Sequence, residues 1–187
     1  MKQSEVNLLC QEAAHCFAQA GWALPPKPQW AATDFGLGDY TNAGLVEVML
    51  ANEPEYCEKI MYAREGMSTP AHTHGQKKED IICRTGSLRL LLWPGKPGTD
   101  KAAGDVEVQI NGAMRTLPAG EPFDLQAGER ITLTPGIWHE FAPASPGTMI
   151  GEVSTWCDEE KDNFFADPNV NIFHDIEPDE PPRYSGF

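Results

Sequence analysis

Residues 66–86 have the sequence GMSTPAHTHGQKKEDIICRTG and contain the most informative pattern in the chain. Two histidines, His72 and His74, are followed after Gly75 by Glu79, and the whole group lies between two glycines. In an extended segment His72 and His74 point to the same side, because side chains alternate along a strand. The spacing from His74 to Glu79 leaves room for the chain to turn and bring the carboxylate back to both imidazoles.

A second stretch, residues 133–141 (LTPGIWHEF), adds His139 after a Pro-Gly turn. Three neutral imidazole nitrogens and one carboxylate suit a borderline first-row divalent ion, such as manganese, iron, cobalt, nickel or zinc. A lone histidine is more often an ordinary surface or core residue, but this grouping favours a common site. We therefore predict one divalent metal site with four protein ligands: His72, His74, Glu79 and His139.

Length and charge limit the classes of protein that the chain can belong to. Its 187 residues are enough for one domain with a sizeable core. It contains 14 Lys and Arg against 28 Asp and Glu, a net charge of -14. Nucleic acid is excluded as a partner on this ground, since phosphate binding needs a basic face. A strongly phosphorylated substrate is disfavoured as well, although two or three local cations would suffice for one.

Cysteine usage predicts a cytoplasmic protein. The cysteines are odd in number and form no CxxC pair, as expected for reduced thiols. The first residues, MKQSEVNLLCQEAAHCF, do not resemble a signal peptide, and we expect no segment apolar enough to span a membrane. The five cysteines are Cys10, Cys16, Cys57, Cys83 and Cys157.

The first part of the chain predicts a helix followed by an extended lead-in. Apolar residues recur at helical spacing over residues 4–20, with Ser4 as the cap and Gly21 as the terminator. His15 lies within this helix among polar neighbours and is interpreted as structural. The proline-rich residues 24–30 (LPPKPQW) cannot continue a helix, so we expect them to run extended over the surface.

From residue 45 the pattern changes to short apolar runs bounded by turn residues, which indicates an all-β sandwich or barrel. Asn111-Gly112 predicts a tight hairpin, and residues 94–105 predict a long loop. The expected strands lie within residues 45–50, 58–65, 80–86, 87–93, 106–112, 114–120, 122–128, 130–136 and 148–154.

After residue 155 the chain becomes polar again. Asp158, Glu159 and Glu160 are interpreted as a solvated run. The tail nevertheless contains too many apolar residues to be free, so we expect it to pack back on the barrel, across its mouth or against a partner. The predicted organisation is a single domain at 1–187, with a lead-in at 1–44, a barrel at 45–155 and a C-terminal extension at 156–187.

The glycine and ligand spacings resemble the two motifs of the cupin superfamily. Gly66, His72, His74, Glu79 and Gly86 match the first motif in full. Residues 128–139 (GERITLTPGIWH) resemble the second, with the proline directly beside the second glycine rather than two residues before it. The resemblance implies a jelly-roll-like cupin β-barrel, here preceded by a helix and followed by an extension.

A narrower resemblance covers nearly the whole chain. The blocks at 33–40, 59–86, 133–141, 151–165 and 176–184 are similar in order and sequence to D-lyxose ketol-isomerases, which are cupin sugar isomerases that depend on manganese. The resemblance implies Mn²⁺ as cofactor, held by His72, His74, Glu79 and His139. It also carries catalytic roles onto Lys77, onto Glu152 of the GEVS run and onto Asp162 of the following DN pair.

The reaction that this resemblance implies is the interconversion of D-lyxose and D-xylulose, with D-mannose and D-fructose as a second pair. Glu152 is the first choice for the base that moves a proton between C2 and C1 through a cis-enediol, and Lys77 would stabilise the enediolate. A hydride shift is the alternative route. The plainer interpretation of Lys77 is an ion pair with Glu79 or Asp80, and that of Asp162 is a turn cap.

Three other functions share the same motifs. A cupin dioxygenase would hold iron in an apolar pocket, whereas an isomerase needs a pocket rich in Glu, Asp and Lys. A phosphosugar isomerase needs a cationic cradle, and a non-catalytic sugar-binding cupin would lack a positioned base. We further expect a homodimer formed through sheet faces and the aromatic-rich terminal segments.

Overall fold

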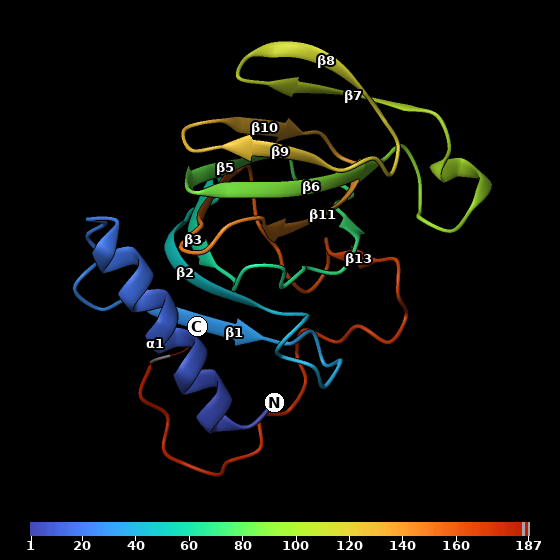
Figure 1. Ribbon diagram of the computed structural model, residues 1–187. Helices are drawn as coiled ribbons and strands as arrows, with labels where there is room; N and C mark the ends of the chain where they lie inside the picture. Colours follow the sequence, from blue (N-terminus) through green and yellow to red (C-terminus); the bar gives the residue numbers. More distant parts are fainter. Residues whose placement is uncertain (185, 187) are drawn as a thin grey trace.

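The computed structural model describes residues 1–184 and 186 and consists of two antiparallel sheets that face each other, with one long helix outside (Figure 1). The eight-stranded sheet has the order β1-β2-β3-β12-β5-β10-β7-β8 and the five-stranded sheet has the order β13-β4-β11-β6-β9. Their strands are β1 Gln29–Thr33, β2 Leu45–Asn52, β3 Cys57–Tyr62, β4 His72–Thr73, β5 Glu79–Thr85, β6 Ser87–Trp93, β7 Asp105–Ile110, β8 Ala113–Pro118, β9 Phe123–Gln126, β10 Arg130–Leu133, β11 Trp138–Pro143, β12 Met149–Ser154 and β13 Phe164–Phe165.

The prediction of an all-β barrel with an N-terminal helix is confirmed. Every apolar run predicted as a strand contains one, and the Asn111-Gly112 turn joins β7 to β8 with φ of 51° and 82°. These positive φ values are those of a two-residue hairpin turn. The long loop between β6 and β7 contains one short 3₁₀ turn, η1 Asp100–Ala102.

The helix α1, Gln3–Gln19, packs on the outer side of β1, β2 and β3. Its apolar stripe, which includes Leu9, Ala13 and Phe17, is fully buried in the core. The helix therefore hides the second face of these strands. As a result β2 is apolar on both faces up to Ala51, apart from Glu47, rather than simply alternating.

The predicted cap of this helix was wrong. The N-cap residue is Lys2, whose backbone N–H donates to a carboxylate oxygen of Glu5 at 2.7 Å. Ser4 lies inside the first turn, where its N–H and its hydroxyl donate to the carboxylate of Asp179 at 2.8 and 2.6 Å. Ser4 therefore connects the helix to the C-terminal segment, a contact that local sequence cannot reveal.

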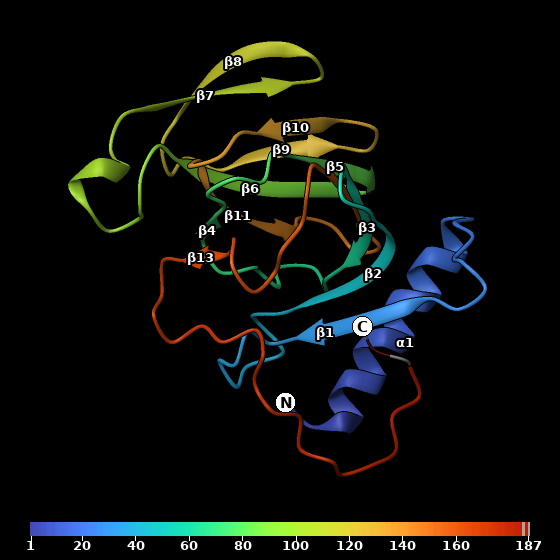
Figure 2. The same ribbon diagram turned by 180° about the vertical axis from the view of Figure 1, so that it is seen from behind.

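The lead-in and the C-terminal segment both join the body. Gln29 and Trp30, the last residues of the proline-rich tract, enter the larger sheet as the start of β1 instead of covering its surface. After β13 the chain runs back along α1, where Gln3 N–H donates to Glu177 C=O at 2.9 Å (Figures 1 and 2).

Among the described residues, no helix is long and apolar enough to cross a membrane.

Candidate active site

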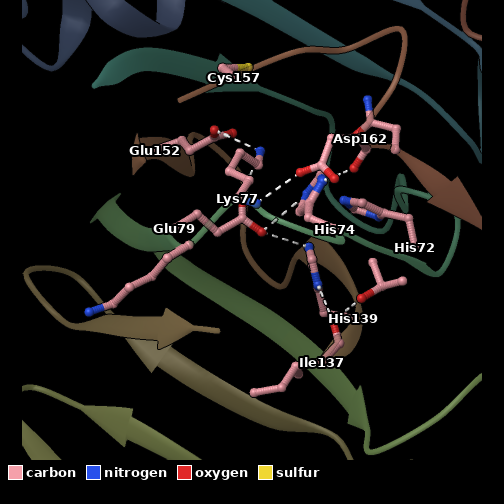
Figure 3. A network of polar contacts seen from close by, with 12 residues as sticks. His72, His74, Lys77, Glu79, Ile137, His139, Glu152, Cys157 and Asp162 are labelled. Atoms are coloured by element: carbon pink, nitrogen blue, oxygen red, sulfur yellow. Dashed lines mark hydrogen bonds and ion pairs between the residues drawn. The ribbon is translucent and has the colours of Figure 1, made fainter. Parts of the chain in front are cut away.

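Three of the predicted ligands are brought together by strand pairing in the smaller sheet. His72 on β4 lies directly opposite His139 on β11, and their ring centroids are 4.1 Å apart. His74 follows β4, with its ring centroid 5.3 Å from that of His72 and 5.7 Å from that of His139. One donor nitrogen from each ring lies within 4.8 Å of the others, which is an arrangement that can hold a metal ion (Figure 3).

Each imidazole is oriented by a backbone carbonyl. Nδ1 of His72 lies 2.9 Å from the carbonyl oxygen of Pro70, and Nδ1 of His74 lies 2.8 Å from that of Asp162. Nδ1 of His139 faces the carbonyl of Ile137 at 3.3 Å. In a neutral ring the nitrogen that faces a carbonyl carries the proton, so Nε2 keeps its lone pair for the interior of the site.

Glu79 completes the group from the larger sheet. Its Oε1 lies 3.1 Å from Nε2 of His139 and 3.4 Å from Nε2 of His74. Among the described residues these three buried atoms have no hydrogen-bond partner. Lone pairs and a carboxylate oxygen that converge without a proton between them repel one another, and a cation among them would convert this repulsion into coordination. The donor set therefore fits a divalent metal ion.

The ionisation of these groups is consistent with this fit. Burial, together with the neighbouring His139 and His74, lowers the pKa of His72 well below its usual value, so this ring is neutral and available as a ligand. Burial raises the pKa of Glu79, but Lys77 and His74 outweigh it and hold that pKa well below the usual range. Burial also lowers the pKa of His74, but Glu79 outweighs it and raises that pKa above its usual value. The site therefore presents a neutral His72 and an ionised Glu79.

Lys77 links the predicted ligand Glu79 to the predicted base Glu152. Its Nζ lies 2.8 Å from Oε2 of Glu79 and 3.0 Å from Oε1 of Glu152, and all three side chains are at most 5% exposed (Figure 3). Burial lowers the pKa of Lys77, but the two carboxylates raise it above its usual value, so the amine stays charged. The structure thus brings Lys77 and Glu152 to the predicted ligands, and Lys77 does pair with Glu79.

Asp162, which was predicted to be catalytic, directs its carboxylate at the backbone of a neighbouring turn. Its buried carboxylate accepts hydrogen bonds from the backbone N–H groups of Gly75, Gln76 and Lys77 at 2.9, 3.1 and 2.8 Å. It holds the turn between His74 and Glu79, and its own carbonyl orients His74. This geometry supports the turn-cap interpretation rather than direct catalysis.

Sequence reasoning missed a second charged group in the same pocket. The amine of Lys59 on β3 lies 3.3 Å from Oε1 of Glu47 on β2 and also contacts Oε1 of Glu159. Glu159 was expected in a solvated run, but it bonds to Lys59 and to Asn163 and lines the pocket. Burial raises the pKa of Glu47 to about 7, although Lys59 acts in the opposite direction.

Glu47 is the one charged residue of the apolar strand β2, and this was the available signal; Lys59 offered no such signal, because it follows Glu58 in β3. The sequence could not show that Glu47 is buried, because this requires α1 on one face of β2 and the cavity on the other. All these groups line one cavity of about 300 Å³ between the two sheets. Its other walls are largely apolar and include Leu45, Met61, Ile81, Phe141, Phe165, Ile172 and Phe173.

Comparison with known proteins agrees with this architecture. A family model described as D-lyxose isomerase matches residues 27–186. The chain is 34% identical over 218 residues to the D-lyxose/D-mannose isomerase of Serratia proteamaculans, covering 98% of this chain and 95% of the relative. It is 29% identical to the D-lyxose ketol-isomerase of Cohnella laeviribosi, covering 96% of this chain and 100% of the relative.

Among solved structures, the L-ribose isomerase of Cellulomonas parahominis with L-ribose superimposes with a TM-score of 0.64 at 19% identity, covering 91% of this chain and 95% of that one. At this identity the likeness establishes the fold, a cupin barrel. The family match spans most of the chain and includes every residue of the pocket. The chain therefore belongs to the D-lyxose isomerase family and is an isomerase built on a cupin barrel.

Proposed function

We propose that this protein is a metal-dependent aldose–ketose isomerase that interconverts D-lyxose and D-xylulose, with D-mannose and D-fructose as a second pair. The names of its relatives support these sugars. The observation that carries the proposal is the convergence of unpartnered donor atoms of His74, Glu79 and His139 beside a buried Lys77–Glu152 pair. Family membership removes the dioxygenase and the non-catalytic alternatives.

His72, His74, Glu79 and His139 would hold the metal ion, and Mn²⁺ is the ion that we propose. A bound divalent cation supplies Lewis-acid polarisation of the substrate carbonyl and the adjacent hydroxyl. The protein's own contribution is to orient the imidazoles, through the carbonyls of Pro70, Asp162 and Ile137, so that each Nε2 faces the ion.

Glu152 is the proposed base. In the direction from aldose to ketose its carboxylate removes the proton from C2 and returns it to C1, while the proton of the C2 hydroxyl passes to the oxygen on C1. No other reactant is needed, because the two sugars are isomers. Lys77, 3.0 Å from Glu152, donates hydrogen bonds to the negative charge that develops on oxygen between the two steps.

The charged part of the pocket suits a neutral polyol better than a phosphorylated sugar. Four glutamates line it, but its two lysines, Lys59 and Lys77, are already paired with carboxylates. A phosphate would meet an excess of negative charge there. Hydroxyl groups, in contrast, can both donate to carboxylates and accept from the lysines.

The proposal also includes a cytoplasmic location and a homodimeric state. All five cysteines are free thiols, which supports a reducing compartment.

An aldose panel tests the proposed activity. Purified protein is stripped of metal, refilled with Mn²⁺ and incubated with D-lyxose, D-mannose and L-ribose, and ketose formation is measured. We expect turnover that requires the added ion and is fastest with D-lyxose. Equal turnover by the stripped protein would contradict metal dependence, and preference for another aldose would contradict the assigned substrate.

A further inference from the structure

Two cysteines meet beside Glu152, on the side away from the histidines. Cys57 begins β3 and lies opposite Ser154 at the end of β12, and Cys157 follows three residues later. The sulfur atoms of Cys57 and Cys157 and a carboxylate oxygen of Glu152 all lie within 4.8 Å of one another. In Figure 3 Cys157 lies beyond Glu152 as seen from the three histidines.

A fourth donor is present at the same point. Oε1 of Glu159 accepts a hydrogen bond from the thiol of Cys157 at 3.1 Å. Two sulfur and two oxygen donors match the four-coordinate preference of zinc, whose tetrahedral geometry places two thiolate sulfurs about 3.8 Å apart. Manganese prefers harder oxygen and nitrogen ligands, so this group would select a different ion from the one proposed for the histidines.

We propose that Cys57, Cys157 and Glu152, with Glu159 as fourth ligand, form a second metal site that takes a thiophilic divalent cation such as Zn²⁺ and inhibits the enzyme when filled. Inhibition follows because Glu152 cannot coordinate that cation and accept a substrate proton at the same time. The inhibition rests on the proposed function, since it takes Glu152 as the base. Binding of the cation does not depend on that function.

Charge balance permits this occupation. Binding of one divalent cation releases the protons of Cys57 and Cys157, so the net charge of the buried cluster does not change. The hydrogen bond between the two thiols lowers the pKa of Cys57 and raises that of Cys157, so the cation has to displace the proton of Cys157. Glu159 gives up its contact with Lys59 when it binds the cation. Lys59 then keeps its ion pair with Glu47, at 3.3 Å.

A path from solvent to the site is also present. Cys157 is partly exposed and borders an open hollow of about 600 Å³. The hollow is lined by Asp158, Glu159, Glu160 and Phe173 as well, and its carboxylates attract cations to the opening.

The test titrates the manganese-loaded enzyme with Cd²⁺ in the presence of a phosphine reductant, which keeps the thiols reduced. Ultraviolet absorption from thiolate-to-cadmium charge transfer reports cadmium bound to thiols and not cadmium at the histidine site, because the histidine site has no sulfur ligand. We expect the band to saturate at about one equivalent per chain. The rate of ketose formation should fall at least ~10-fold over the same titration and recover with a chelator and fresh Mn²⁺.

Variants separate this site from other thiols. Cys157→Ser should lose the band and raise the inhibiting concentration by more than ~10-fold, relative to its own uninhibited rate. Cys57→Ala should give the same result, and it replaces Cys157→Ser as the test if that variant does not fold. Cys16→Ser, on α1, is the matched control and should behave as wild type.

The outcomes are distinct. A band that persists in both variants, or no band at one equivalent, overturns the site. A band without inhibition overturns the assignment of Glu152 as a shared ligand. If no sugar is turned over before cadmium is added, the proposed function fails, while the band still decides the metal site.

Discussion

Glu79 joins the two halves of the active site through its two oxygens. Oε1 faces His74 and His139, and Oε2 lies 2.8 Å from the amine of Lys77, which also contacts Glu152. The ligand half and the proton-transfer half are therefore coupled but consist of different residues. Substitutions in each half should consequently affect different measurable properties.

Replacement of Glu152 tests the proton-transfer half. Glu152→Gln keeps the shape of the side chain and can still accept a hydrogen bond from Lys77, but it is not basic. We expect metal content to be unchanged and kcat to fall at least ~10²-fold. Solvent deuterium should enter the ketose made by the wild-type enzyme, because an abstracted proton can exchange. A near-normal rate would assign the base elsewhere, and an unlabelled product would favour a hydride shift.

Replacement of His74 tests the ligand half. His74→Ala removes one imidazole donor, so bound manganese and activity should both be lost, as measured by elemental analysis and ketose formation. His15→Ala is the control, since His15 is exposed on α1. Wild-type metal content in His74→Ala would show that the ligand set is wrong.

Glu47 should make stability depend on pH. Its folded-state pKa of about 7 lies above the usual 4.5, so the folded protein binds more protons than the unfolded chain within this window. Stability should therefore fall as pH rises through the window, by about 1–3 kcal/mol from this group. Glu47→Gln should lose that part of the slope in urea unfolding at about pH 5 and about pH 8. An unchanged slope would rule out the shifted pKa.

At the scale of elements, the turn between β4 and β5 is held from a distance. Asp162 lies in the segment after β12, yet it binds three consecutive N–H groups of this turn and orients His74. Gly75 allows this close approach, because a Cβ atom at this position would lie only 3.1 Å from Oδ1 of Asp162 and push it away. The geometry of the candidate metal ligands thus depends on a contact between distant segments.

Asp162→Ala should loosen this turn. Three buried N–H groups lose their acceptor, at a cost of ~1–3 kcal/mol each where water does not replace it. We expect lower stability in urea and metal affinity reduced by ~10–100-fold. Asp158→Ala is the matched control, because its carboxylate accepts similar backbone bonds from Glu160 and Lys161 nearer the surface. Equal effects in both variants would remove the special role of Asp162.

At the scale of the whole molecule, an apolar surface lies at one end of the larger sheet. Tyr56, Val153 and Trp156 are 49%, 39% and 36% exposed, and they flank the paired residues Cys57 and Ser154. The edge strand β8 of this sheet belongs to the β7–β8 hairpin, which projects from the body (Figure 1). The apolar surface is thus the better candidate for contact between two copies.

We therefore predict a homodimer that uses this surface. Light scattering at micromolar concentration should give twice the mass of the chain, and Trp156→Glu should shift the protein toward monomer because it places a charge in an apolar contact. Met114→Glu is the control, since Met114 is 66% exposed on the β7–β8 hairpin. A wild-type monomer would contradict the prediction.

The sequence by itself determined the local features of this protein. Alternating apolar runs, the Asn-Gly turn and the glycine-bounded HxH segment depend on neighbours in the chain. They were sufficient for an all-β barrel, for most of its strands but not β1 or β13, and for four residues that converge on one point. The resemblance to D-lyxose ketol-isomerases singled out Lys77 and Glu152 as well, and both lie beside that point.

Only the tertiary structure decided how distant segments complete the site. It placed Lys59 between Glu47 and Glu159, turned Asp162 toward the backbone of another loop, and brought Cys157 to Cys57. None of these contacts has a local signal, because each joins residues far apart in sequence through strand order and the return of the C-terminal segment. Burial then sets their ionisation, since the pKa of Glu47 rises only when the barrel removes it from water.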